Sequence, residues 1–382
     1  MNEIQPSRVA QVLGVALPII QGPFGGGLST TRLAAAVSES GGLGSYGAHN
    51  LAPEEIGRVA AELRALTSRP FALNLWVSDH DPGGLALDER EFERVTRLFE
   101  PWYRELGVEL PEMPARYGQR YDEQVEALLE ARPPVFSFVF GVPTRAVLAE
   151  CRRRGIVTVG AATSVAEARL LEEARIDLIV ASGFEAGGHR PSFLARAEDA
   201  LMGTFALTQL VTARIATPVV AAGGIADRRG VRAALALGAE AVQVGTAFLA
   251  CAESGATEEH RDRMFGDEAF ATTLTRAFTG RLARGIRNRW TEEMSALTPG
   301  LPPFPIQSWF AGQMRDAARS AQRTDVVALW SGQIAPNLRH RNAAALMNEL
   351  RKGVVADSTG SQVFTHKATA DAARSSTNGG ST

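Results

Sequence analysis

Lysine is nearly absent from this chain. Of the 40 residues that are Lys or Arg, only Lys352 and Lys367 are lysines, and both lie near the C-terminus. Only an amine that can lose its proton forms a Schiff base, so this chemistry is excluded from the main body of the chain. A phosphate bound there must be held by arginine or by backbone N–H groups.

Cysteine, excess charge and long apolar runs are also lacking. Cys151 and Cys251 are the only cysteines, too few for a disulfide framework or a thiolate metal cluster, and we expect small buried thiols. The 42 acidic residues nearly cancel the 40 basic ones, which argues against a nucleic-acid partner. No run approaches the roughly 18 apolar residues of a membrane span, and the first residues lack a secretory signal pattern. We therefore expect a cytoplasmic protein with no membrane partner.

From about residue 15, short β-branched apolar runs alternate with amphipathic stretches, as is typical of βα units around a parallel sheet. The runs predict eight strands, over residues 17–21, 42–46, 71–77, 135–140, 156–161, 177–182, 218–222 and 241–245. Helices are predicted between them, over residues 31–40, 53–67, 121–131, 144–154, 164–174, 204–214 and 227–237. An open doubly wound sheet would show the same alternation, but the count of eight favours an α/β fold of the closed (βα)8 TIM-barrel type.

The pattern also predicts how the chain is divided. Residues 1–255 form the barrel, with an inserted excursion over 79–120 after strand 3, which could serve as a lid at the barrel mouth. Beyond residue 255 we expect strands to cease and an appended C-terminal helical region, or cap, to cover 256–355, with helices over 306–322 and 340–350. Residues 356–382 are rich in Ser, Thr, Gly and Ala and are predicted to be disordered.

Two glycine-bearing strand ends carry the strongest chemical signal. Gly223 and Gly224 follow the seventh predicted strand, and Gln243-Val244-Gly245-Thr246 ends the eighth. In (βα)8 barrels the loops after strands 7 and 8 are the usual phosphate site, where bare backbone N–H groups converge on the anion. A phosphate-bearing ligand is predicted, and both a flavin mononucleotide and a sugar phosphate fit this motif.

A histidine lies in the glycine-rich loop after the sixth predicted strand, whose sequence from Ser182 to Arg190 reads SGFEAGGHR. Gly187 and Gly188 would let a flat ligand approach the backbone, and His189 has an ordinary pKa suited to removing a proton near neutrality. Glu185 and Arg190 could orient it or pair with each other. The remaining histidines, His49, His80, His260, His340 and His366, are isolated and lack metal-ligand spacing, so no metal is predicted.

Small residues also follow the first predicted strand. Gln21-Gly22-Pro23 would allow a planar ring system to lie against the backbone, and Asn74 in the third strand could offer its amide to a ring edge. A purely structural role for Asn74 is equally open. The chain has no GxSxG elbow and no Walker-type GxxxxGK, which makes hydrolase and NTPase functions unfavoured.

Taken in order, eight sequence blocks resemble the nitronate monooxygenase family over about residues 15–290. They are PIIQGP, STTRLAAAVSESGGLGSYG, FALNLWV, FSFVFG, GFEAGGHR, PVVAAGGIADRRG, ALGAEAVQVGTAFLA and TGRLARGIRNRW. The resemblance implies an FMN-binding TIM barrel that oxidises alkyl nitronates with O2 to a carbonyl compound and nitrite. It implies that FMN is contacted by Asn74, Ser182, Gly187, Gly224 and Gln243 to Thr246, and that His189 is the catalytic base.

Three residues depart from the family pattern. Phe24 stands where many members have Met, Ser182 where many have Gln, and Pro191 where GGHRG would have Gly. These departures bear most on substrate range. Arg281, Arg284 and Arg287 fit the pattern, and salt bridges to the barrel are expected of them.

Several alternatives stay open. A flavin-dependent enoyl-acyl-carrier-protein reductase would share the phosphate loops and the histidine but would need NAD(P)H. A flavin-binding protein without turnover would share the fold alone. A sugar-phosphate isomerase barrel is a third alternative. Apolar side chains in the C-terminal helices would serve a homodimer as well as the barrel exterior.

Overall fold

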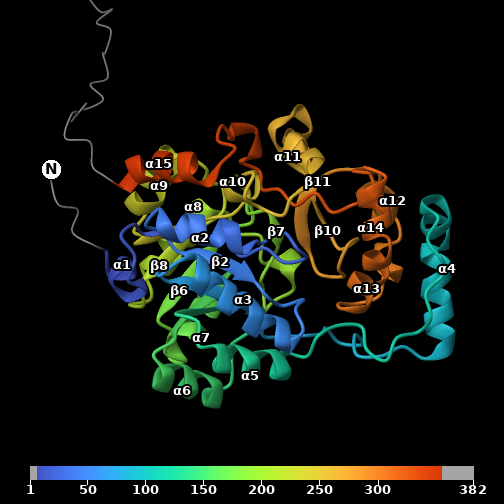
Figure 1. The fold of residues 1–382 in the computed structure, drawn as a ribbon, viewed down its shortest axis with the longest axis horizontal. Coiled ribbons are helices and arrows are strands. Elements are labelled where there is room, and N and C mark those ends of the chain that lie inside the picture. Colours follow the sequence, from blue (N-terminus) through green and yellow to red (C-terminus); the bar gives the residue numbers. More distant parts are fainter. Residues whose placement is uncertain (1–6, 355–382) are drawn as a thin grey trace, which may run out of the picture.

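The structure, a computed structural model, describes residues 7–354, so the predicted tail over 356–382 lies outside the described residues. Eight parallel strands form the central sheet, with neighbours in the order β1-β9-β8-β6-β5-β4-β3-β2. Hydrogen bonds between Gln21 N and Leu43 O (2.9 Å) and between Leu43 N and Ile19 O (2.9 Å) join its two ends. The sheet is therefore the closed TIM barrel that the sequence predicts (Figure 1). Its strands are β1 (Ile19–Gln21), β2 (Gly44–Gly47), β3 (Phe71–Trp76), β4 (Val135–Val139), β5 (Val157–Ala162), β6 (Leu178–Ser182), β8 (Val219–Ala222) and β9 (Ala241–Val244).

Helices cover the outside of the barrel. They are α2 (Thr31–Glu39), α3 (Pro53–Leu66), α5 (Tyr121–Ala131), α6 (Arg145–Arg154), α7 (Val165–Glu173), α8 (Thr204–Thr212) and α9 (Arg228–Ala236), while α1 (Arg8–Leu13) precedes the first strand. The side chains of Thr30, Thr144, Ser164 and Asp227 accept hydrogen bonds from the first backbone N–H groups of α2, α6, α7 and α9. The predicted helices between the strands are thus confirmed, with ends shifted by a residue or two.

The last described helix, α15 (Ala343–Val354), belongs to the barrel in space and not to a separate cap. Leu346, Met347 and Leu350 are fully buried and share a core with Leu33 of α2 and Val231 of α9. This differs from the expectation of a cap that continues to residue 355. An amphipathic helix fits either location, and its neighbours in space are far from it in sequence.

Strands do not cease at residue 255, so that part of the sequence prediction was wrong. β10 (Thr272–Thr275) and β11 (Ala283–Ile286) form an antiparallel sheet with β7 (Gly188–His189). Each strand is four residues or shorter, and Arg281, Arg284 and Gly285 interrupt the apolar alternation that normally marks a strand. The sheet therefore forms through pairing between distant segments.

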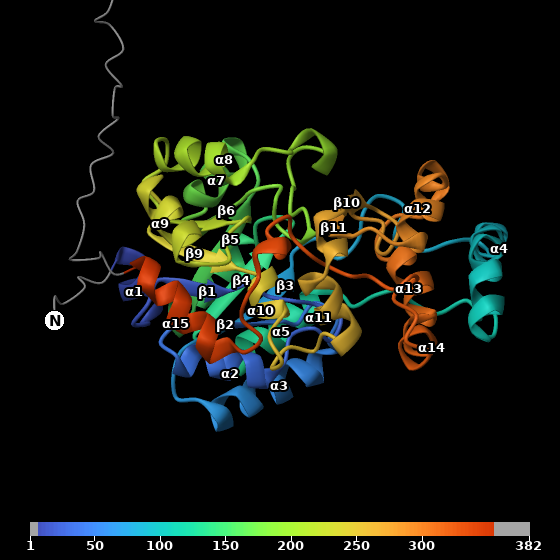
Figure 2. The same cartoon turned by 90° about the horizontal axis from the view of Figure 1, so that it is seen from above.

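The insertion and part of the C-terminal region form a lobe beside the barrel. It contains α4 (Glu89–Leu106), α12 (Arg289–Ser295), α13 (Ile306–Gln313) and α14 (Arg315–Ser320). Phe99, Trp102, Trp290 and Phe310 pack together in its core. Figures 1 and 2 show α12 and α13 between α4 and the barrel, so α4 does not cover the barrel mouth here. The helix predicted over 306–322 is two helices, which meet at Met314.

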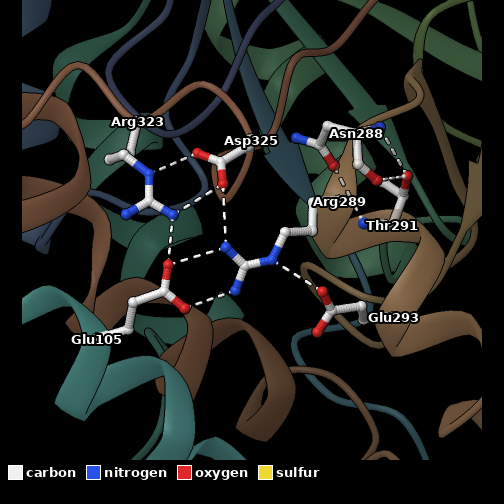
Figure 3. Close-up of polar contacts among 7 residues, drawn as sticks. All are labelled: Glu105, Asn288, Arg289, Thr291, Glu293, Arg323 and Asp325. Atoms are coloured by element: carbon white, nitrogen blue, oxygen red, sulfur yellow. Dashed lines mark hydrogen bonds and ion pairs between the residues drawn. The ribbon is translucent and has the colours of Figure 1, made fainter.

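A network of charged side chains fastens α4 to the rest of this lobe (Figure 3). Glu105 of α4 receives hydrogen bonds from Arg289 and Arg323, and both arginines also contact Asp325. The two arginines lower the pKa of Glu105 to about 2. The remaining short elements are α10 (Thr246–Leu249), α11 (Glu258–Phe265) and the 3-10 helices η1 (Ala197–Asp199), η2 (Asp267–Phe270), η3 (Thr298–Gly300) and η4 (Ala335–Asn337).

Three sequence expectations concern single features of residues 7–354. Cys151 and Cys251 are buried free thiols, as predicted. Within this range no helix is long and apolar enough to cross a membrane. The same range holds no group of three or more His, Cys, Asp or Glu side chains arranged to bind a metal ion.

Candidate functional site

The carboxyl ends of the barrel strands open into a cavity of about 290 Å3. The loops after β1, β2, β6, β8 and β9 surround it, and the segment 324–334 covers part of its outer side. In parallel barrels this end carries the ligand site because the loops that follow all the strands meet there. The sequence-predicted residues can therefore be checked against one cavity.

Almost all of the predicted site residues line this cavity. Those that do are Gly22, Asn74, Ser182, Gly187, His189, Gly223, Gly224, Gln243, Gly245 and Thr246. Gln21 and Val244 do not line it. The Gln21 side-chain amide donates to Ser45 O (2.8 Å) and accepts from Ser45 N (3.0 Å), which joins β1 to β2 where the barrel closes. Val244 is fully buried in the apolar core.

The glycine-bearing ends of β8 and β9 leave backbone donors free. Gly223 and Gly224 have φ values of +110° and +70°, a conformation that favours glycine. Among the described residues, no hydrogen bond is donated by the backbone N–H groups of Gly224, Gly245 and Thr246. Because buried amides are nearly always paired, free donors beside a cavity indicate an anionic ligand.

Two side-chain amides face the same cavity. Asn74 donates to Ser137 Oγ (3.0 Å), while its Oδ1 accepts no hydrogen bond within the described part of the chain. The Gln243 side chain makes no hydrogen bond in that part at all. Such amides are suited to the polar edge of a heterocyclic ring, which presents both donors and acceptors.

His189 is held in place by residues from the small antiparallel sheet. It lies in β7, paired with Ala283 of β11, and its Nε2 is 2.8 Å from Thr279 Oγ1. The rings of Trp76 and Trp330 lie against it, with centroid distances of 4.7 and 5.3 Å. Its Nδ1 makes no hydrogen bond with any described residue. The imidazole therefore has a fixed orientation and one nitrogen available to a ligand.

Burial and a nearby cation keep this imidazole neutral. Desolvation, with a smaller contribution from the positive charge of Arg281, lowers the pKa of His189 to about 3. The imidazole is therefore neutral at physiological pH, but this low pKa makes it a weaker base than the ordinary histidine that the sequence suggested.

Arg281 connects the insertion to the site. Its guanidinium donates to Asp81 Oδ1 (2.7 Å) and Ser78 O (3.1 Å) and lies over the rings of Phe140 and Phe304, both at 4.2 Å. Arg281 thus forms a salt bridge, but its partner lies in the insertion and not in the barrel as expected. Arg284 instead donates to Phe184 O (3.0 Å) in the glycine-rich loop, and Arg287 is exposed.

Glu185 and Arg190 do not pair with each other. The Glu185 carboxylate accepts from Thr204 N and Thr204 Oγ1, both at 2.9 Å, and so holds its loop against the start of α8. Arg190 is buried and donates to the backbone oxygens of Ala200 and Ser182. Both residues position the loop that carries His189.

Sequence reasoning missed several side chains of the cavity. Trp76 follows Asn74 by two residues, so strand alternation indicates that both share a face. His49, treated as isolated, stacks on Trp76 with a centroid distance of 3.9 Å, and its pKa is lowered well below the usual value by burial. Thr279 and Trp330 lie in segments far from His189 in the sequence, and no local sequence pattern identifies them as site residues. The three departures, Phe24, Ser182 and Pro191, all line the cavity.

Comparison with known proteins assigns the family. A family model described as nitronate monooxygenase matches residues 7–353. The chain belongs to the nitronate monooxygenase family. A protein named "Probable nitronate monooxygenase" from Staphylococcus aureus (strain Newman) is 37% identical over 328 residues, which cover 86% of this chain and 91% of that protein. A second one, from strain MSSA476, is 38% identical with the same coverage.

Solved structures agree with this family membership. The nitroalkane oxidase of Streptomyces ansochromogenes has a TM-score of 0.83 and 36% identity, covering 91% of this chain and 98% of that one. FabK from Thermotoga maritima is less similar, with a TM-score of 0.71, 27% identity, and coverage of 92% and 96%. Nitronate monooxygenases depend on a flavin, so this family member is a flavin-dependent oxidoreductase.

The residues of this nitronate monooxygenase family member fit a flavin. The free amides at Gly224, Gly245 and Thr246 suit a phosphate, and the side-chain amides of Asn74 and Gln243 suit the polar edge of the ring. No lysine lines the cavity within the described residues, and the backbone donors at the ends of β8 and β9 are suited to take its place. This arrangement agrees with the flavin dependence of the family.

Proposed function

We propose that this enzyme binds FMN and oxidises alkyl nitronates with O2 to a carbonyl compound and nitrite, and that it also accepts neutral nitroalkanes. The observation that carries this proposal is the combination, in one cavity, of free backbone donors and a buried neutral imidazole. When bound, the flavin supplies the redox chemistry. The protein supplies binding, orientation and control of the proton.

The proposed FMN contacts fall into two groups. Gly223, Gly224, Gly245 and Thr246 hold the phosphate through backbone N–H groups at the ends of β8 and β9. Gly22, Asn74, Ser182, Gly187 and Gln243 contact the ring and its linker. Gln21 and Val244, which do not line the cavity, support these contacts by fixing β1 and β9.

His189 acts as the base when the substrate is a neutral nitroalkane. Thr279 engages Nε2, so Nδ1 is the proposed acceptor of the α-proton. The role requires the bound substrate to raise the pKa of His189 from the value of about 3 that burial gives it. A preformed nitronate needs no deprotonation, and there His189 only positions the anion.

The His189→Asn variant tests this role. We expect it to lower kcat/KM for neutral 1-nitropropane by about a hundredfold or more, the usual contribution of a general base, and to affect propane 1-nitronate much less. His340→Asn is a matched control because His340 does not line the cavity. Equal turnover of neutral 1-nitropropane by His189→Asn and the wild type would remove the base assignment.

The reductase alternative is tested with the same preparation. FabK of Thermotoga maritima shares the fold at 27% identity, so a reductase that uses NAD(P)H is the second candidate. Rapid bleaching of the bound flavin by NADPH, with none by a nitronate under anaerobic conditions, would favour it. A flavin that neither compound reduces would favour a binding protein without turnover.

A further inference from the structure

The cavity does not end at His189 and Trp330. It continues into the lobe between α11 and α14, and we call this part the side arm. Its lining consists of Thr257, Glu259, His260, Ser308, Ala311, Met314, Arg315, Ala318, Arg319, Gln322, Arg323, Thr324 and residues 326–329. Figure 2 shows α14 in the lobe beside the barrel, next to α13.

The inner part of the side arm is apolar. Met314, Ala318 and Val326 are buried there, and Leu329 continues the same surface toward Trp330. No charged side chain interrupts this stretch from Val326 to Trp330. An apolar channel of this kind favours a hydrocarbon chain over water.

Two arginines without partners follow further out on α14. The side chains of Arg315 and Arg319 make no hydrogen bond or ion pair with any described residue. They lie four residues apart on one helix face, where like charges repel and destabilise the helix. Both arginines line the outer part of the side arm, and both are exposed to solvent. An anion between the two guanidinium groups would remove this repulsion.

The other charged groups of the side arm already have partners. Glu259 on the opposite wall accepts a hydrogen bond from Gln322 Nε2 (2.6 Å) and pairs with neither arginine. Arg323 is engaged by Asp325 and Glu105 (Figure 3). Asp316, next to Arg315 in sequence, is exposed like the two arginines and supplies one negative charge against their two positive charges. The uncompensated charge of the side arm is therefore positive.

We propose that the side arm binds the far end of the substrate, a linear nitronate whose chain ends in a carboxylate, with Arg315 and Arg319 holding that carboxylate. The proposal rests on the proposed function, because the nitronate end must lie beside His189. Arginine recognises carboxylates through paired N–H donors, and the apolar stretch between the two ends accommodates the methylene chain.

The test compares nitronates of equal length with and without a terminal carboxylate. The pair of greatest interest is the nitronate of 9-nitrononanoic acid and that of 1-nitrononane, measured with the FMN-loaded enzyme. We expect the ratio of their kcat/KM values to favour the acid and to fall by about tenfold in the Arg315→Ala/Arg319→Ala double variant. The charge-preserving Arg315→Lys/Arg319→Lys variant should retain most of the preference.

Arg90→Ala is the matched control, since Arg90 is an exposed arginine of the same lobe and does not line the cavity. It should leave the ratio unchanged. If Arg90→Ala lowered the ratio of kcat/KM values as much as the double variant does, the preference would come from the overall positive charge of the lobe. That result would overturn the proposal. An unchanged ratio in the double alanine variant would overturn it as well.

A binding measurement separates this proposal from the proposed function. Decanoate cannot be oxidised, and its binding can be followed through the visible spectrum of the bound flavin. We expect the double alanine variant to weaken decanoate binding by about tenfold. If short nitronates are oxidised but decanoate binds both proteins equally, only the side-arm proposal fails. If no nitronate is oxidised, the proposed function fails. If the double alanine variant loses affinity for NADPH but not for decanoate, the arginines bind a dinucleotide phosphate, and the side-arm proposal is overturned.

Discussion

At the scale of single residues, Gly224 is the clearest case of a backbone conformation that the proposed phosphate site requires. Its φ of +70° lets its N–H point toward the cavity, and an alanine there would be strained even though the nearest atom to its Cβ would be 3.8 Å away. Gly57 offers a contrast, because it lies on the exposed face of α3 with nothing within 4 Å of an added Cβ. The two glycines therefore respond oppositely to the same substitution.

We expect Gly224→Ala to lower the free energy of unfolding by about 1–2 kcal/mol and to weaken FMN binding, because the left-handed conformation is costly for alanine. Gly57→Ala should raise stability by about 1 kcal/mol and leave FMN binding unchanged, since alanine is the better helix former. Urea unfolding and FMN titration measure both quantities. Unaltered FMN affinity in Gly224→Ala would contradict the role given to this loop.

The sequence identifies site residues where a local pattern accompanies them. His189 is preceded by Gly187 and Gly188, and Gly224 follows a clear strand, so both could be predicted. Thr279 and Trp330 could not, because they reach His189 through pairing between segments far apart in the chain. His49 lies only two residues beyond β2, and its place after a strand end was the available signal.

At the scale of elements, the attachment of α4 divides into an apolar and a charged part. Phe99 is fully buried between Tyr103, Trp290 and Phe310, whereas Glu105 is about one third exposed. Burial of an aromatic ring contributes far more than a screened ion pair. Packing should therefore hold α4 in place, and the network in Figure 3 should fix its direction.

We expect Phe99→Ala to cost about 3–5 kcal/mol of stability. Glu105→Gln should cost less than about 1 kcal/mol, because its ion pairs are exposed to solvent and screened. Thermal or urea unfolding of the two variants checks this order. A larger loss from Glu105→Gln would mean that the charged network, and not the aromatic core, holds the insertion.

The barrel elements could be predicted because each strand and helix is long enough to show its period locally. The short strands β7, β10 and β11 show no such period, and they exist only as a set. The location of α15 could not be predicted either, because its apolar face would pack equally well against a separate cap or against the barrel. In both cases the missing information is the identity of a partner distant in sequence.

At the scale of the whole molecule, buried histidines make stability depend on pH. Burial lowers the pKa of His189 to about 3 and of His260 to about 4, and it lowers the pKa of His49 strongly. In the unfolded chain these groups titrate near 6.5, so the unfolded state binds more protons below that pH. Their contribution to stability is complete above pH 6.5 and is lost as the pH falls toward 4.

We expect the flavin-free protein to lose stability between pH 7 and pH 5, by at most about 1.4 kcal/mol per pH unit for each histidine that stays neutral in the fold. His260→Gln should reduce this slope, and His340→Gln should not. Urea unfolding at several pH values measures it. A free energy of unfolding that stays constant from pH 7 to pH 5 would contradict the burial of neutral histidines.

The cavity at the barrel mouth is proposed to hold a flavin where a nitronate can reduce it. An anaerobic titration of the FMN-loaded protein with propionate 3-nitronate, followed by visible spectroscopy, measures this reduction. We expect the nitronate to bleach the flavin, and we expect O2 to restore the oxidised spectrum with release of nitrite. A polypeptide that takes up no FMN, or a bound flavin that stays oxidised in excess nitronate, would contradict this proposal.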